Sequence, residues 1–388
     1  MKKFLIVLLK IGISAAIVAW MVGDAMKTKD GVNVFANLVE QHKHWAMLAA
    51  AWTLCMVATL VMFVRWWYLV RALEIPCRFA DAVRISFWGF LFNLAPLGIV
   101  GGDLVKAALL AHEQRRYRAR AVASVLIDRV IGLYLLLVVA STAILLTGFW
   151  RMDVADIRLI CHATFALTVA GAVGIAVMLT PGVAERCGAR LLGRIPRVGP
   201  MLESLSDAVR MLRHKPGVLI VSSAMSVGVH CLSAAGCYLI ARGLPGRVLA
   251  LSSYFVIMPL SGATCVLPLP LGPLELVLEF LYTHVPTEAG AIATGQGLLV
   301  ALGYRLMTLL IAALGICYYF GNRRQLAEVI HEAGHEDQSP GQVVTIWAEN
   351  PQRSVRTRGA GGHQDCGSSR LFSDSHATFR ESSRRPVS

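Results

Sequence analysis

Long apolar segments separated by short polar ones make up most of the chain. A run of about 20 apolar residues, wound as an α-helix, is long enough to cross the hydrocarbon core of a bilayer. The pattern predicts that the chain crosses the membrane repeatedly as helices. The predicted full spans cover residues 4–22, 45–64, 121–147, 159–180, 218–240 and 291–320.

A further apolar stretch, residues 85–100, is too short to cross the membrane and has basic residues on both sides. A helix of that length extends about 24 Å, whereas the hydrocarbon core is about 30 Å thick. Arg78 and Arg84 precede the stretch, and Arg115 and Arg116 follow it. Because clustered arginines mark cytoplasmic segments, we expect this stretch to enter the membrane and return to the same side.

A second interrupted stretch, residues 249–282, contains several prolines and glycines. The predicted spans before and after it require that it enter and leave on the opposite, outer side, since Arg323 and Arg324 place the end of the last span in the cytoplasm. Interrupted segments at corresponding positions of two halves are typical of transporters built from inverted repeats. A pair of ordinary kinked helices is the alternative.

Composition supports this architecture. The 388 residues are 56% hydrophobic and 16% charged, which indicates an all-α polytopic membrane protein with about six full spans and two broken or re-entrant helical hairpins. The membrane domain is expected to cover residues 1–331, and residues 332–388, rich in Ser, Arg and Gly, are expected to form a disordered tail. Lys2 and Lys3 favour a cytoplasmic N-terminus in the cell membrane, and the C-terminus is expected on the same side.

Charge and cysteine content narrow the function classes. The net charge of +13 comes from basic residues beside the ends of apolar segments, a pattern that indicates membrane topology rather than nucleic-acid binding. The nine cysteines show no CxxC or other metal-ligand spacing, so neither a zinc site nor a disulfide framework is predicted. No cofactor is expected.

The first interrupted stretch carries candidate anion-binding chemistry in the sequence NLAPLGIVGGDLVK. Gly101 and Gly102 permit unusual backbone conformations, and Asp103 is a good N-cap for a half-helix that begins at Leu104. Such a helix end favours an anion such as phosphate, and Lys106 adds a full charge one turn later. In the alternative interpretation, Asp103 and Lys106 neutralise each other and the glycines only allow helices to approach closely.

Other charges inside apolar segments need partners. Asp128 and Arg129 lie near the start of the predicted span 121–147 and are expected either at the headgroup level or facing the cavity of the first hairpin. In the second stretch, Gly272 fits an N-cap and Glu275 the third position of a half-helix. Glu275 is the expected partner of Arg305 in the last span, either as a structural ion pair or as part of a binding site.

Several segments together resemble a known family. The segments FNLAPLGIVGGDLVKAALL, ASVLIDRVIGL, GPLELVL and YRLMTLLIAALG are similar to the transmembrane domain of lysylphosphatidylglycerol synthases, also called the flippase-like domain, over residues 4–320. The positions that the resemblance implies as characteristic are Asn93, Pro96, Gly101, Gly102, Asp103, Arg129, Gly272, Glu275 and Arg305. This chain departs from the family pattern at Lys106, often Arg, at Asp128, often Glu, and at Leu269 and Pro270, where glycines are usual.

The resemblance implies movement of an anionic phospholipid or a polyprenyl-phosphate-linked lipid between leaflets, with membrane lipids as the partners. The alternative is a membrane-embedded component of a lysyl- or glycosyltransferase, or a helper subunit of a separately encoded lipid-modifying enzyme. The soluble loops contain no DxD motif, and the tail is too short to fold as a catalytic domain. A non-enzymatic role is therefore favoured, and the enzymatic one stays open.

Overall fold

The computed structural model describes residues 2–26, 34–94, 98–180, 207–267, 269, 271–285 and 292–319, and within these ranges all regular secondary structure is helical. The predicted tail, residues 332–388, lies outside the described residues. The long helices are α1 (Lys2–Met26), α3 (Trp45–Ala72), α6 (Arg118–Thr147), α7 (Ala155–Leu179), α10 (Pro216–Gly243) and α13 (Gln296–Tyr319). Short helices α2 (Val34–Glu40), η1 (Arg115–Tyr117) and η2 (Phe149–Arg151) adjoin them.

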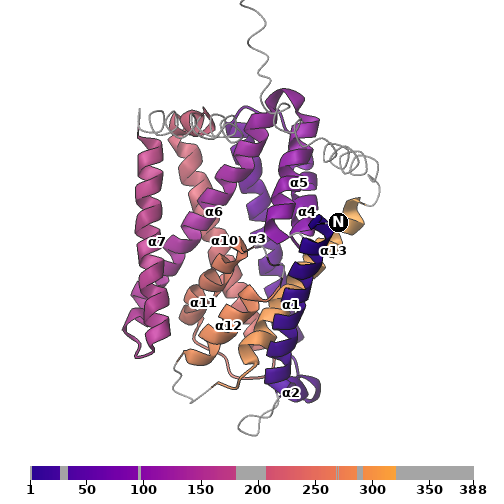
Figure 1. Ribbon diagram of the computed structural model, residues 1–388, viewed down its shortest axis with the longest axis vertical. Coiled ribbons are helices and arrows are strands. Elements are labelled where there is room, and N and C mark those ends of the chain that lie inside the picture. Colours follow the sequence, from indigo (N-terminus) through magenta and orange to yellow (C-terminus); the bar gives the residue numbers. More distant parts are fainter. Residues whose placement is uncertain are drawn as a thin grey trace, which may run out of the picture. The chain divides into compact units, whose positions relative to one another are not determined.

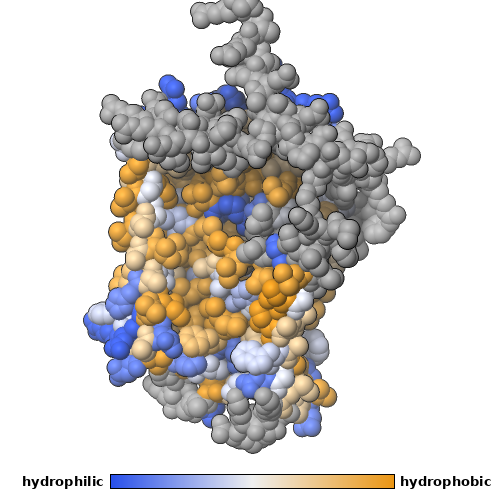
Figure 2. Space-filling view, in the orientation of Figure 1, coloured by the Kyte–Doolittle hydropathy of each residue, from blue (hydrophilic) through white to orange (hydrophobic). Residues whose placement is uncertain are grey.

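The predicted spans are confirmed as long apolar helices. Five of them, α3, α6, α7, α10 and α13, are long and apolar enough to cross a membrane, and α1 contributes the apolar stretch Gly12–Met26. Large apolar side chains such as Leu146 and Leu159 are 83% and 70% exposed on them. Figure 2 shows this apolar surface as an orange region between bluer ends. The chain is an all-α polytopic membrane protein, because such a surface requires lipid around it.

The first interrupted stretch forms a helical hairpin of α4 (Phe79–Leu94) and α5 (Gly98–Glu113). Arg84 near the start of α4 binds Glu113 at the end of α5, with Nη2 and Oε1 2.5 Å apart. The outer ends of the two arms therefore lie at the same end of the molecule, as predicted. The hairpin is longer than expected, since its arms run from residue 79 to residue 113 and each has 16 residues. Each arm alone extends about 24 Å.

The prediction that Asp103 caps a half-helix starting at Leu104 is wrong. Helix α5 begins at Gly98, so Gly101, Gly102 and Asp103 all lie inside it. The physical reason for glycine at position 102 is close packing against α4. A Cβ atom there would lie 2.1 Å from the backbone oxygen of Gly89 and 2.0 Å from Oδ1 of Asn93. The arms touch through their backbones at this point, as the alternative interpretation of the glycines anticipated.

The second interrupted stretch also forms a hairpin, made of α11 (Leu251–Ala263), the short helix η3 (Thr264–Val266) and α12 (Pro273–His284). The hydroxyl groups of Tyr254 and Tyr282 lie 2.9 Å apart at its base. The Tyr282 hydroxyl also donates to the carbonyl of Arg247, just beyond the end of α10. The base of this hairpin is therefore at the C-terminal end of α10.

Helices α3 and α10 pack against each other in opposite directions and define the two ends of the molecule. The N–H of His44, before α3, donates to the carbonyl of Gly243 at the end of α10, 3.0 Å away. At the other end, the ammonium of Lys215 lies 2.8 Å from the carbonyl of Ala72. The α4–α5 hairpin enters from the Ala72 end and the α11–α12 hairpin from the Gly243 end, as the labels in Figure 1 show.

The helix contacts repeat between two halves. The first half contains α3, α4, α5 and α6, which correspond in this order to α10, α11, α12 and α13 of the second half. Each helix–helix contact in one half has a counterpart between the corresponding helices of the other. Thus α5 packs on α6 as α12 packs on α13, and α4 touches α13 as α11 touches α6. Together with the antiparallel packing of α3 and α10, this pattern supports the predicted inverted repeat. Helices α1 and α7 lie outside the repeat and contact α13 and α6, respectively.

We expect Gly102→Ala to destabilise the first hairpin. The added methyl meets the backbone of Gly89, which cannot move away as a flexible side chain can, and overpacking of this kind costs about 1–3 kcal/mol. The loss is measured by thermal unfolding of the purified protein in detergent. Gly228→Ala on α10 is the matched control, because no atom lies within 4 Å of its added methyl. Equal stability of the two variants would contradict the close backbone contact.

The arrangement of the hairpins also predicts topology. In a cysteine-free background, Arg84→Cys and Arg115→Cys should be labelled from one side of the membrane by an impermeant maleimide, because they lie at the same end of the molecule. Arg242→Cys, at the C-terminal end of α10, should be labelled from the other side. Labelling of positions 84 and 115 from opposite sides would make residues 85–100 a true span.

Candidate functional site

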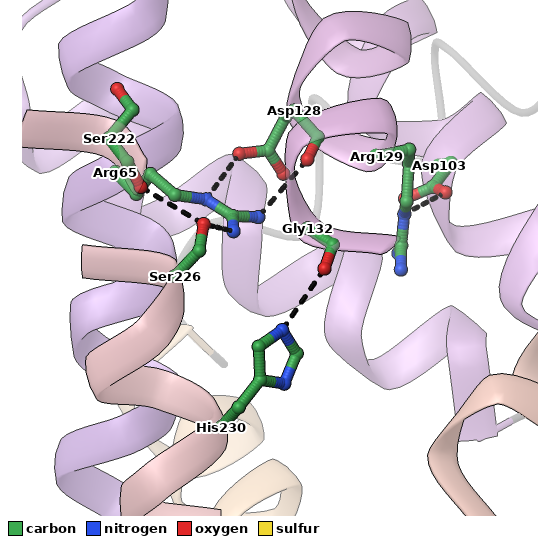
Figure 3. A network of polar contacts seen from close by, with 8 residues as sticks. All are labelled: Arg65, Asp103, Asp128, Arg129, Gly132, Ser222, Ser226 and His230. Carbon is green, nitrogen blue, oxygen red and sulfur yellow. Dashed lines mark hydrogen bonds and ion pairs between the residues drawn. The ribbon is translucent and has the colours of Figure 1, made fainter. Parts of the chain in front are cut away.

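Charged side chains gather inside the apolar part of the molecule, where α3, α5, α6, α12 and α13 carry them. They form a first group around α6 and a second group between α12 and α13. Figure 3 shows most of the first group, with Asp128 and Arg129 pointing to opposite sides of α6. Isolated charges at membrane depth are costly, so each needs a partner or a polar cavity.

Asp128 binds Arg65 of α3. The distance from Arg65 Nε to Asp128 Oδ1 is 2.9 Å, and both side chains are only 6% exposed. Arg65 also donates to the hydroxyl of Ser226 on α10, so this pair joins three helices. Gly132 leaves room for the guanidinium group, because a Cβ atom there would lie 3.2 Å from Nη2 of Arg65. The carbonyl of Gly132 lies 3.0 Å from Nε2 of His230.

Arg129 binds Asp103 of α5 on the other side of α6. Its Nη2 lies 2.6 Å from Asp103 Oδ1, and its Nε pairs with the second carboxylate oxygen, so the pair is bidentate. The Arg129 side chain is 34% exposed and that of Asp103 is 18% exposed. Asp103 thus has Arg129 as its ion-pair partner, whereas the self-neutralising alternative paired it with Lys106. This pair is open to its surroundings, unlike the pair of Asp128 and Arg65.

Lys106 on α5 has both pairs as charged neighbours and is 6% exposed. Its ammonium stands over the ring of Trp66, 4.2 Å from the ring centroid, where the π-system attracts a cation. Asp128 and Asp103 attract it electrostatically, whereas Arg129 and Arg65 repel it. Its aliphatic chain runs over Gly89, where a Cβ atom would lie 2.3 Å from Lys106 Cγ. The first group therefore holds its cations close together.

The predicted pair of Glu275 and Arg305 is present in the structure. Arg305 Nε donates to Glu275 Oε1 at 2.6 Å, and Glu275 is completely buried. Glu275 Oε2 accepts the N–H of Gly272 at 2.8 Å, which caps α12 as the sequence predicted. Gly272 has φ 109°, a left-handed conformation that favours glycine. The carboxylate thus fixes both the start of α12 and the arginine of α13.

A cavity of about 20 Å³ lies where the tips of the two hairpins meet. It is lined by Asn93, Thr264, Cys265, Leu269, Pro273, Leu274 and Arg305. Within the described part of the chain, the buried Oδ1 atom of Asn93 has no hydrogen-bond partner. A space of this size has room for about one water molecule. In this conformation, the cavity is too small for a lipid headgroup.

The predicted site residues lie either at the cavity between the hairpin tips or in the first charged group and the packing of α5. Asn93, Gly272, Glu275 and Arg305 lie at or beside the cavity between the hairpin tips. The others belong to the first group or to the packing of α5: Gly101, Gly102, Asp103, Lys106, Asp128 and Arg129.

Sequence reasoning missed Arg65, Trp66, Ser226 and His230. Arg65 lies in an apolar run, VMFVRWWYLV, and this position is the sequence signal that could have found it. His230 is a single histidine in an apolar segment, and nothing in its neighbourhood in the sequence signals the contact with Gly132. The serine and the tryptophan carry no sequence signal for contact with these charges.

The sequence matches a known protein family over most of its length. A family model described as the lysylphosphatidylglycerol synthase TM region matches residues 7–315. The chain belongs to this family. The match contains every charged residue of the two groups described above. Searches of curated proteins and of solved structures found no match to it.

We expect Arg65→Met to be among the most destabilising single changes in the site. It leaves the Asp128 carboxylate buried without its main counter-ion, and breaking a buried pair in this way costs about 3–5 kcal/mol. The double variant Arg65→Met/Asp128→Asn removes both charges and should recover at least half of the loss in unfolding experiments. If the double variant is as unstable as the single one, the Arg65–Asp128 charge pair is not what stabilises the contact between α3 and α6.

Proposed function

We propose that the protein moves an anionic lipid between the two leaflets of the membrane, with the headgroup phosphate bound at the charged groups on α5 and α6. Its family is related to lipid modification or flipping. The finer assignment to a flippase is supported mainly by Arg129. Its side chain forms a bidentate ion pair with Asp103 and is still 34% exposed, although the surrounding protein surface is apolar. An arginine in that position can bind a phosphate that arrives from the surrounding lipid.

The charge balance of the first group favours an anion. Arg65, Lys106 and Arg129 are cations, whereas Asp103 and Asp128 are the two carboxylates that pair with the arginines. One positive charge is left in this group, and an anionic headgroup would neutralise it. Figure 2 shows hydrophilic surface beside α6 within the orange apolar region. A headgroup could therefore reach the site sideways from the bilayer while its acyl chains stay in lipid.

An apolar groove on the same helices provides a place for an acyl chain. It has a volume of about 580 Å³ and lies between α6, α10 and α11. Val227 and Cys231 line it on α10, directly beside Ser226 and His230 of the polar network. An acyl chain in this groove would lie beside the buried network, on the side of α6 opposite to Arg129.

Transfer of a headgroup requires the hairpins to move apart. The cavity between their tips holds about one water molecule at about 20 Å³, and broken helices at the centre of inverted repeats are the elements that open in transporters. The basic end, which carries Arg78, Arg84, Arg115 and Arg116, is proposed to face the cytoplasm. On this assignment, the α4–α5 hairpin enters from the cytoplasmic side of the cell membrane.

The test is transbilayer movement in liposomes that contain the purified full chain. Wild-type protein should move labelled phosphatidylglycerol or a polyprenyl phosphate faster than protein-free liposomes do. Lys106→Met keeps the volume of the side chain but removes its charge, and should slow the movement about 10-fold or more, because contacts with charged groups are worth about 1.5–3 kcal/mol.

The matched control is the double variant Arg84→Gln/Glu113→Gln, which removes an ion pair at the outer end of the same hairpin. It should keep the wild-type rate. If wild-type protein moves no anionic lipid from a broad panel, the flippase proposal is wrong.

The second candidate function is a component of a lipid-modifying enzyme, which is favoured by the description of the matched family as a region of a synthase. A flippase changes the leaflet of a lipid without changing its chemistry, whereas an enzyme component changes the lipid itself. Mass spectrometry of lipids from cells with and without the protein separates the two. A change in total lipid composition with no change in leaflet distribution would favour the enzyme component.

A further inference from the structure

The inverted repeat places two ion pairs on corresponding helices. Under the exchange of the two halves, α5 corresponds to α12 and α6 to α13. Asp103 and Glu275 therefore lie on corresponding helices, and so do Arg129 and Arg305. Each half has a carboxylate on the returning arm of its hairpin and an arginine on the next helix. This correspondence follows from helix contacts that did not use the charges.

The local geometry of the two pairs agrees with this correspondence. In both pairs the guanidinium Nε binds a carboxylate oxygen. The partners are 26 residues apart in the first pair and 30 in the second. Both carboxylates lie within the first two turns of their helices, close to the hairpin tips. The two pairs are thus alike in chemistry, spacing and position.

The two pairs also lie near one another. Arg129, Arg305 and Glu275 are all near the Cys265 side chain, which lies at the tip of the second hairpin. Cys265 and Arg305 line the cavity between the hairpin tips. Both arginines therefore lie near the tip of the second hairpin.

The two pairs differ in exposure. Arg129 and Asp103 are 34% and 18% exposed, whereas Arg305 and Glu275 are 22% and 0% exposed. A transporter built from an inverted repeat alternates between two conformations, each open to one side of the membrane. In either conformation, corresponding sites of the two halves are expected to differ in exposure. In the opposite conformation the exposures would be exchanged.

We propose that Asp103–Arg129 and Glu275–Arg305 are two equivalent anion-exchange stations, and that a lipid phosphate passes from one arginine to the other. Each arginine releases its carboxylate while it binds the phosphate, and rebinds the carboxylate when the phosphate leaves. The carboxylate therefore competes with the lipid and drives its release. This inference rests on the proposed function, because it describes how the same site would carry an anionic headgroup.

The competition predicts opposite effects on binding and movement. Asp103→Asn removes the competing anion, so Arg129 should retain phosphatidylglycerol more tightly, by roughly 5-fold or more as in typical coupled sites. Release then becomes slower, and transbilayer movement should fall by a similar factor. Glu275→Gln should behave in the same way at the other station. Arg129→Gln and Arg305→Gln should lower both binding and movement.

The experiment uses the purified full chain in two measurements. Native mass spectrometry with added phosphatidylglycerol measures retention, with phosphatidylcholine as the neutral-headgroup comparison, and liposomes measure movement. Arg129→Lys keeps the charge but not the bidentate geometry and should be intermediate, which separates binding from misfolding. Arg84→Gln/Glu113→Gln is the control for loss of an ion pair outside the stations.

The outcomes distinguish this inference from the function on which it rests. If Asp103→Asn and Glu275→Gln lower retention together with movement, the carboxylates are structural and the exchange is wrong. If only one pair shows the opposite effects, the stations are not equivalent and the inference also fails. If retention changes as expected but wild-type protein moves no lipid, the two anion-binding stations stand and the flippase function fails.

Discussion

The packing of the helices depends on ion pairs between charged side chains that lie within the apolar part of the molecule. An ionised side chain in hydrocarbon is tolerated when an opposite charge or a polar cavity meets it. Three pairs satisfy this requirement among the described residues, and each joins different helices: Arg65–Asp128 joins α3 to α6, Arg129–Asp103 joins α6 to α5, and Arg305–Glu275 joins α13 to α12. The same contacts that neutralise the charges therefore hold both hairpins against the long helices.

Close backbone packing makes these contacts possible. Helix α5 approaches α4 at Gly89 and Gly102, and the aliphatic chain of Lys106 occupies the space over Gly89. Gly132 likewise leaves room for the guanidinium of Arg65. Larger residues at these positions would push the helices apart and lengthen the ion pairs, which lose strength with distance. Glycine here serves helix packing, while the left-handed conformation of Gly272 serves the start of α12.

The sequence predicted the helices better than the partners of the charges. Apolar run length and arginine clusters were sufficient to predict the spans and the entry of the two hairpins from opposite ends of the helix bundle. The pairing of Glu275 with Arg305 was also predictable, because Pro273 fixes the start of α12 and the last span contains one arginine with an obvious need for a counter-ion. The sequence predicts the wrong position for Asp103 because Gly and Asp are favoured at an N-cap and disfavoured inside a helix. The close packing of α5 on α4 at Gly102 overrides this local preference.

The ion pairs differ in burial, and the proposed exchange of anions depends on this difference. Arg65 and Asp128 are each 6% exposed, so an anion could reach that arginine only by opening three helices. The side chain of Arg129 is 34% exposed, and a phosphate offers it the same bidentate geometry that a carboxylate does. Exchange of one oxyanion for the other therefore changes the energy of Arg129 little, whereas loss of the Arg65 pair would be costly. A protein that must stay folded while it releases a bound anion needs pairs of both kinds.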